Sequence, residues 1–135
     1  MSRADDWLNQ AHRDLTHAEE SKKMTHFEWA VLASQQGAEK AIRALYYELG
    51  ADPWGHSILK FFKKLPKKIT TDPELINAAK YLDKHYITAR YPNGFASGAP
   101  EDYYTKNDAE NAIKNAKKIY KFCENQISSL RRKID

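Results

Sequence analysis

Apolar residues recur at intervals of three and four along most of this chain, which is the spacing of one face of an α-helix. A first helix over roughly residues 3–22 is predicted by the apolar stripe Trp7, Leu8, Ala11, Leu15 and Ala18. No segment alternates apolar and polar residues for long enough to predict a β-strand. The pattern therefore indicates an all-α protein.

A second helix is predicted from Thr25 to Leu49. Thr25 and Glu28 have the spacing of a capping box, in which each side chain bonds the backbone N–H of the other residue. Gly50 follows the last apolar position, and glycine enters the left-handed conformation that ends helices without strain. The apolar stripe is rich in small residues: Ala30, Ser34, Gly37, Ala38 and Ala41. Small side chains let a neighbouring helix approach closely, which favours a central position in a bundle; otherwise Gly37 is a tolerated weak point.

The second half of the chain predicts a short helix and two longer ones. An amphipathic segment follows Ser57 and stops before Pro66. The run Asp72-Pro73-Glu74 is a strong helix start, because aspartate caps, proline suits the first helical position and an acid suits the positive end of the helix dipole. Thr105 and Asp108 predict the cap of a long last helix whose apolar stripe reaches Leu130.

These elements predict the fold class. We expect a single all-α domain over residues 1–135, an up-and-down bundle of four to five helices. A long loop of irregular pattern, from about Ile87 to Tyr104, precedes the last helix. Loops of that length inside a small bundle are uncommon and are often functional.

Composition narrows the class further. The chain has 135 residues, enough for one ordinary core. Asp5 and Asp6 stand where a signal peptide would have its apolar stretch, and no apolar stretch approaches the ~20 residues of a spanning helix. The single cysteine, Cys123, rules out an intrachain disulfide and fits a reducing compartment. We expect a cytoplasmic protein that does not associate with membranes.

The residue types that bind metals or cofactors form no recognisable motif. The glycines are too scattered for a phosphate loop, and Cys123 has no cysteine partner. No HExxH pair is present among the five histidines His12, His17, His26, His56 and His85. The sequence therefore predicts no metal site and no cofactor.

Basic residues are unevenly distributed, although the net charge is only +4. Five lysines fall within nine residues: Lys60, Lys63, Lys64, Lys67 and Lys68. Such a cluster is typical of a surface that contacts nucleic-acid phosphates. It is equally typical of a solvated helix face. Both interpretations stay open on sequence alone.

Arg90 lies in the irregular segment among several tyrosines. A guanidinium can hold phosphate with two hydrogen bonds, and tyrosine rings can stack on a base. The alternative is structural: the tyrosines seal the end of the bundle and Arg90 pairs with a carboxylate such as Asp83.

Four elements in this order resemble a HEPN domain (higher eukaryotes and prokaryotes nucleotide-binding). They are Ser34 to Ala41 (SQQGAEKA), His56-Ser57, Tyr86 to Pro92 (YITARYP) and Tyr104-Thr105. The resemblance extends from about Trp7 to Ile127. It implies a helical bundle that is usually dimeric and is often encoded beside a small nucleotidyltransferase, as in toxin–antitoxin systems.

The resemblance also bears on activity. Many HEPN domains are metal-independent ribonucleases whose signature is an arginine followed, after four to six residues, by a histidine. Arg90 matches the arginine, but Phe95, Ala96 and Ser97 occupy the histidine positions. The resemblance therefore implies a non-catalytic module that binds a nucleotide or RNA, or pairs with a nucleotidyltransferase. The residues assigned to ligand binding are Arg90, Tyr86, Tyr91, Tyr104 and Lys40.

Two alternatives remain. One is a ribonuclease that combines Arg90 with a histidine from elsewhere, such as His56 or His85. The other is a helical dimerisation protein with no ligand.

Overall fold

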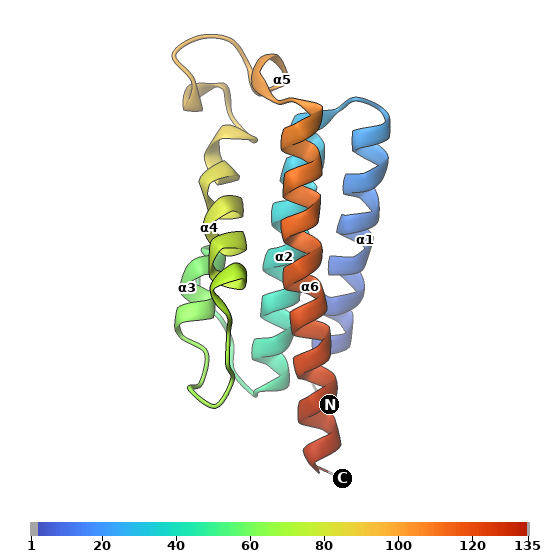
Figure 1. Ribbon diagram of the computed structural model, residues 1–135, viewed down its shortest axis with the longest axis vertical. Coiled ribbons are helices and arrows are strands. Elements are labelled where there is room, and N and C mark those ends of the chain that lie inside the picture. Colours follow the sequence, from blue (N-terminus) through green and yellow to red (C-terminus); the bar gives the residue numbers. More distant parts are fainter. Residues whose placement is uncertain (1–2, 135) are drawn as a thin grey trace.

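Long helices lie side by side in the computed structural model, which describes residues 3–134 (Figure 1). The elements are α1 (Ala4–Lys23), α2 (Phe27–Glu48), α3 (Ile58–Lys63), α4 (Pro73–Thr88), the 3₁₀ turn η1 (Pro92–Gly94), α5 (Pro100–Tyr103) and α6 (Lys106–Ile134). Helices α1, α2, α4 and α6 alternate in direction along the chain (Figure 1). No strand occurs within the described range, so the all-α, up-and-down bundle is confirmed. The expected long loop is the connector that holds η1 and α5.

Helix α2 is the central helix, as its small residues predict. It packs against α1, α3, α4, α5 and α6. At Gly37 a β-carbon would lie 2.9 Å from Cδ2 of Leu15 and 3.2 Å from the carbonyl oxygen of Ala11. Helix α1 therefore lies too close to α2 at Gly37 to leave room for a side chain, and this glycine is more than a tolerated weak point.

The predicted cap at Thr25 is wrong. Thr25 has a positive φ of 62°, and the helix begins two residues later with no side-chain cap. The backbone N–H of His26 donates to the carbonyl of Ser21 at 2.9 Å, and that of Thr25 donates to the carbonyl of Lys22 at 3.0 Å. This pattern ends α1, and a residue in the left-handed region cannot adopt the extended geometry of an N-cap.

The other predicted helix ends are confirmed. Gly50 has a φ of +79° and follows Leu49, the C-cap residue of α2. The Asp72 side chain accepts a hydrogen bond from the backbone N–H of Leu75 at 3.0 Å. Thr105 and Asp108 cap each other: the N–H of Thr105 donates to the Asp108 carboxylate at 2.9 Å, and the N–H of Asp108 donates to the Thr105 hydroxyl at 3.2 Å.

Asp83 of α4 anchors the start of α3. Its carboxylate accepts hydrogen bonds, each of 3.0 Å, from the Ser57 hydroxyl and from the backbone N–H groups of Ile58 and Leu59. The first-turn N–H groups of a helix have no partner within the helix, so this carboxylate satisfies two of them. The predicted Asp83–Arg90 pair is therefore wrong, because α3 occupies the carboxylate.

Candidate functional site

A groove of about 500 Å³ opens between α1, α2, the turn before α3 and the end of α4. Its walls carry basic side chains, aromatic rings and polar groups. The lining residues are Trp7, Gln36, Glu39, Lys40, Arg43, His56, Tyr86 and Arg90. Three of the five residues assigned to ligand binding from the sequence, Arg90, Tyr86 and Lys40, therefore share one groove.

Arg90 enters this groove as a cation that no acid within the described residues neutralises. Its guanidinium carbon lies 4.4 Å from the centre of the Tyr86 ring, within the range of a cation–π contact. Nη2 donates to the amide oxygen of Gln35 at 2.9 Å. Nε is buried and has no hydrogen-bond partner among the described residues, and no described carboxylate lies within ion-pair distance. Gln35 is neutral, so the charge of Arg90 remains available to an anion.

Polar side chains four residues apart on α2 form the floor beside Arg90. The carboxylate of Glu39 accepts from Gln35 at 3.5 Å and from Nε of Arg43 at 3.1 Å. Arg43 also donates to the carbonyls of Pro53, at 3.2 Å, and Gly55. These bonds hold the linker after α2 against the helix, and the linker carries the next groove residue.

That residue is His56. Its Nδ1 lies 3.1 Å from the Glu39 carboxylate, and its ring stacks on Tyr86 with centroids 5.8 Å apart. The side chain is 64% exposed. Nε2 has no partner among the described residues, so one ring nitrogen is held by Glu39 and the other is open to solvent.

Lys40 is paired with an acid. Its ammonium lies 2.6 Å from the Asp14 carboxylate and 3.5 Å from the amide oxygen of Gln36. An ion pair of this kind cancels much of the field of the lysine, so Arg90 is the main source of uncompensated positive charge.

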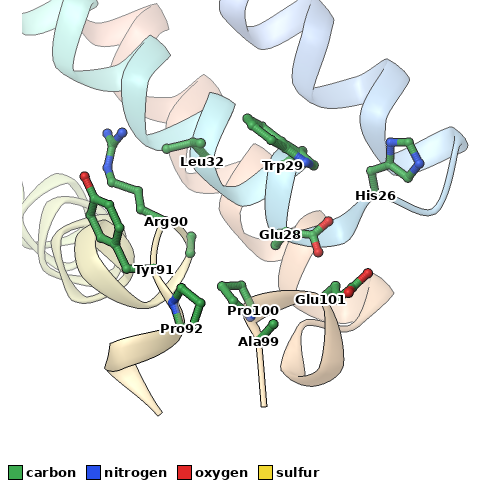
Figure 2. A pocket seen from close by; sticks show the side chains of 11 residues that line it. His26, Glu28, Trp29, Leu32, Arg90, Tyr91, Pro92, Ala99, Pro100 and Glu101 are labelled. Carbon is green, nitrogen blue, oxygen red and sulfur yellow. The ribbon is translucent and has the colours of Figure 1, made fainter. Parts of the chain in front are cut away.

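Tyr91 lies outside the groove, in a neighbouring hollow of about 590 Å³. Figure 2 shows the side chains that line this hollow, among them Trp29, Leu32 and Pro100. The Arg90 guanidinium is directed away from Pro100 and Glu101. Trp29 is 55% exposed and Tyr91 is 51% exposed, which is high for large aromatic side chains. The hollow thus exposes two large aromatic side chains next to the groove, and Glu28 and Glu101 line it as well.

Tyr104 is also outside the groove, where it joins α4 to the start of α6. Its hydroxyl lies 2.8 Å from Nδ1 of His85 and 2.7 Å from the hydroxyl of Thr88. Burial lowers the pKa of His85, partly offset by Asp108, and burial raises the pKa of Tyr104. Both residues serve a contact between helices, and neither lines the groove.

No group of three or more His, Cys, Asp or Glu side chains within residues 3–134 is arranged to hold a metal ion. Over the same range, none of the helices combines the length and apolar character needed to cross a membrane.

Comparisons with known proteins give a consistent picture. The family model described as HEPN domain matches residues 4–126. Among solved structures, TT1696 from Thermus thermophilus is 42% identical with a TM-score of 0.91, covering 93% of this chain and 99% of that one. ST0689, an archaeal HEPN homologue, is 38% identical with a TM-score of 0.80, covering 94% of this chain and 99% of that one.

Two further relatives are more distant. A HEPN domain protein from Thermotoga maritima, tm0613, is 34% identical with a TM-score of 0.75, covering 91% of this chain and 98% of that one. The protein named "Putative toxin MJ1304" from Methanocaldococcus jannaschii is 27% identical over 122 residues, 84% of this chain and 80% of that protein. The match to the family model spans most of the chain, and solved HEPN proteins share its fold. The chain therefore belongs to the HEPN domain family.

Proposed function

We propose that this protein is a non-catalytic HEPN module whose groove binds the phosphate of a nucleotide. One observation carries the proposal: the Arg90 guanidinium lines the groove, its one hydrogen bond among the described residues goes to a neutral amide, and no described carboxylate neutralises it. Phosphate supplies the negative charge and the acceptor oxygens that this guanidinium lacks. The Tyr86 ring against the guanidinium holds it in place.

The remaining walls suit the rest of a nucleotide. Trp7 and Tyr86 add aromatic surface to the groove, although both rings also pack on protein groups: Trp7 on Tyr47, and Tyr86 on Arg90 and His56. Arg43 and Lys40 raise the potential of the groove, although each is paired with an acid. Phosphate contacts would thus come chiefly from Arg90.

A partner subunit belongs to the same proposal. A relative carries the name of a toxin, and the HEPN resemblance implies genes placed beside a small nucleotidyltransferase. We infer that this chain pairs with such a subunit in a toxin–antitoxin-like system. It would contribute a nucleotide-binding surface and no catalytic histidine, because Phe95, Ala96 and Ser97 occupy the positions where the ribonuclease signature has its histidine.

Arg90→Lys tests the groove. Lysine keeps the charge but loses the two-pronged donor geometry, so we expect nucleotide affinity to fall about tenfold while the melting temperature stays nearly constant. Titration calorimetry with mononucleotides, with melting curves alongside, measures both. Arg13→Lys is the matched control, because Arg13 is exposed and lies outside the groove. A variant that melts several degrees lower and binds nucleotides unchanged would make Arg90 a structural residue.

A metal-independent ribonuclease is the second candidate, and the position of His56 favours it. Nε2 of His56 would accept the proton of a ribose 2′-hydroxyl while Glu39 holds Nδ1. The new bond joins O2′ to phosphorus, the bond from phosphorus to O5′ breaks, and O5′ takes a proton from solvent. Arg90 would stabilise the charge on the phosphate. His85 lies outside the groove and is bonded to Tyr104, so it has no part in this candidate.

Labelled RNA incubated with the protein and a chelator separates the two candidates. Intact RNA is the expected result. Cleavage that both His56→Ala and Arg90→Ala abolish would establish the ribonuclease instead.

We also propose that the protein is a homodimer through the hollow beside Arg90. Trp29 and Tyr91 are exposed there beside Leu32 and Pro100, and protein interfaces are enriched in buried aromatic side chains of this kind. Glu28 and Glu101 also line the hollow, so part of the interface would be polar. A monomeric protein would contradict this proposal. It would also contradict the third alternative from the sequence, a helical dimerisation protein with no ligand.

A further inference from the structure

Five lysines on α3 and the turn after it form one exposed basic surface, named here the lysine face: Lys60, Lys63, Lys64, Lys67 and Lys68. None of them makes a side-chain hydrogen bond or ion pair with a described residue. Three lysines of α6 differ: Lys117 pairs with Glu19 at 2.7 Å, Lys118 with Glu74 at 3.1 Å and Lys121 with Glu124 at 3.6 Å. The lysine face therefore carries positive charge that the described part of the fold leaves uncompensated.

The apolar residues of the same segment are buried. They are Ile58, Phe61, Phe62, Leu65 and Ile69, each no more than 9% exposed. To solvent, this segment offers mainly ammonium groups. Protein interfaces are depleted in lysine at their centres and depend on buried aromatic and apolar contacts. A chain of phosphates is a better match, because its binding gains mainly from counterion release.

The lysine face begins where the groove ends. His56 lines the groove, and the next residue, Ser57, caps α3 by accepting a hydrogen bond from the backbone N–H of Lys60 at 3.2 Å. From Lys60 to Lys64 the helix rises about 6 Å, which is close to two nucleotide steps of about 3.4 Å on a stacked strand. Trp54, on the linker before His56, is 89% exposed and offers a ring on which a base can stack.

We propose that the lysine face binds the sugar–phosphate backbone of a single-stranded nucleic acid whose path leads into the Arg90 groove. This inference rests on the proposed phosphate binding at Arg90 and extends it: the ligand is a polynucleotide, and a free mononucleotide fills only one end of the site. The lysines contact phosphates without reading sequence, since ammonium groups on flexible stems carry charge but no base-specific geometry.

The experiment compares two triple variants with the same change in net charge. Lys60→Gln/Lys63→Gln/Lys64→Gln removes most of the lysine face. Lys117→Gln/Lys118→Gln/Lys121→Gln removes three lysines of α6, each of which is ion-paired. Fluorescence anisotropy with a labelled single-stranded RNA of about 12 nucleotides gives affinity as a function of salt.

We expect the first variant to lose roughly tenfold or more in RNA affinity and its log–log salt slope to become shallower by about two. The α6 variant should stay close to wild type. Circular dichroism melts confirm that both variants are folded, as expected for substitutions of surface lysines.

Three outcomes overturn the inference: no RNA binding by the wild type, an equal loss in both triple variants, or a wild type that polyglutamate or phosphatidylserine vesicles displace from RNA as well as unlabelled RNA does. The proposed function fails separately. If RNA affinity falls in the lysine-face variant but is unchanged in Arg90→Lys, the proposed phosphate site at Arg90 is contradicted and RNA binding by the lysine face is supported. If mononucleotide binding depends on Arg90 but RNA affinity is unchanged in the lysine-face variant, the Arg90 site is supported and the lysine face is contradicted.

Discussion

Replacing Asp83 by alanine is expected to lower the free energy of unfolding by about 3 kcal/mol. The carboxylate accepts three hydrogen bonds, from Ser57, Ile58 and Leu59, at the start of α3. Alanine would leave two backbone N–H groups in a partly buried place without a partner, and hydrogen bonds to a charged group are the stronger kind. Urea denaturation followed by circular dichroism measures the change.

Asp83→Asn is the matched comparison. It keeps one side-chain oxygen that can accept hydrogen bonds, so we expect it to lose less than half as much stability as the alanine variant. Two variants that unfold at the same urea concentration as wild type would show that α3 does not need this anchor. Because α3 follows the turn that carries His56, the alanine variant should also bind nucleotides more weakly.

Trp29→Glu is expected to convert a dimer into a monomer. In the proposed dimer Trp29 would be buried against the second copy, and an unpaired carboxylate in that place costs several kcal/mol. Light scattering at micromolar concentration should give twice 15.6 kDa for wild type and 15.6 kDa for the variant. The helix itself tolerates the change, because the side chain is more than half exposed in the single chain.

Trp54→Glu is the control for this experiment. It makes the same substitution at a tryptophan that is 89% exposed and does not line the hollow, so the dimer should persist. A wild type that scatters as 15.6 kDa would contradict the proposed dimer directly.

Most of the fold could be predicted because the decisive signals are local. Apolar spacing defines each long helix, and Asp72, Gly50 and the Thr105–Asp108 pair mark ends within a few residues. Thr25 shows where local reasoning fails. Its sequence fits the start of α2, but the chain reverses direction sharply after α1, and Thr25 takes a left-handed conformation to end that helix.

The candidate site was predictable only in part, because its contacts are distant in sequence. Arg90 bonds Gln35 across 55 positions, and no local pattern reveals that pairing. Asp83 was a plausible partner for Arg90 because it lies about two helical turns away, whereas α3 takes that carboxylate. Glu39 and Arg43 were missed as groove residues. Polar residues repeated every four positions on the predicted central helix were the available signal.

Helix α2 uses two of its sides for unrelated purposes, and this limits how the gene can change. Gly37 sits against Leu15 and Ala11 of α1, while Glu39 and Arg43 meet the groove. Each residue along a helix turns the chain by about 100°. A single-codon insertion or deletion between Gly37 and Glu39 would therefore leave only one of these sides correctly aligned. Insertions and deletions among related sequences should therefore lie in the connectors between helices and not within α2.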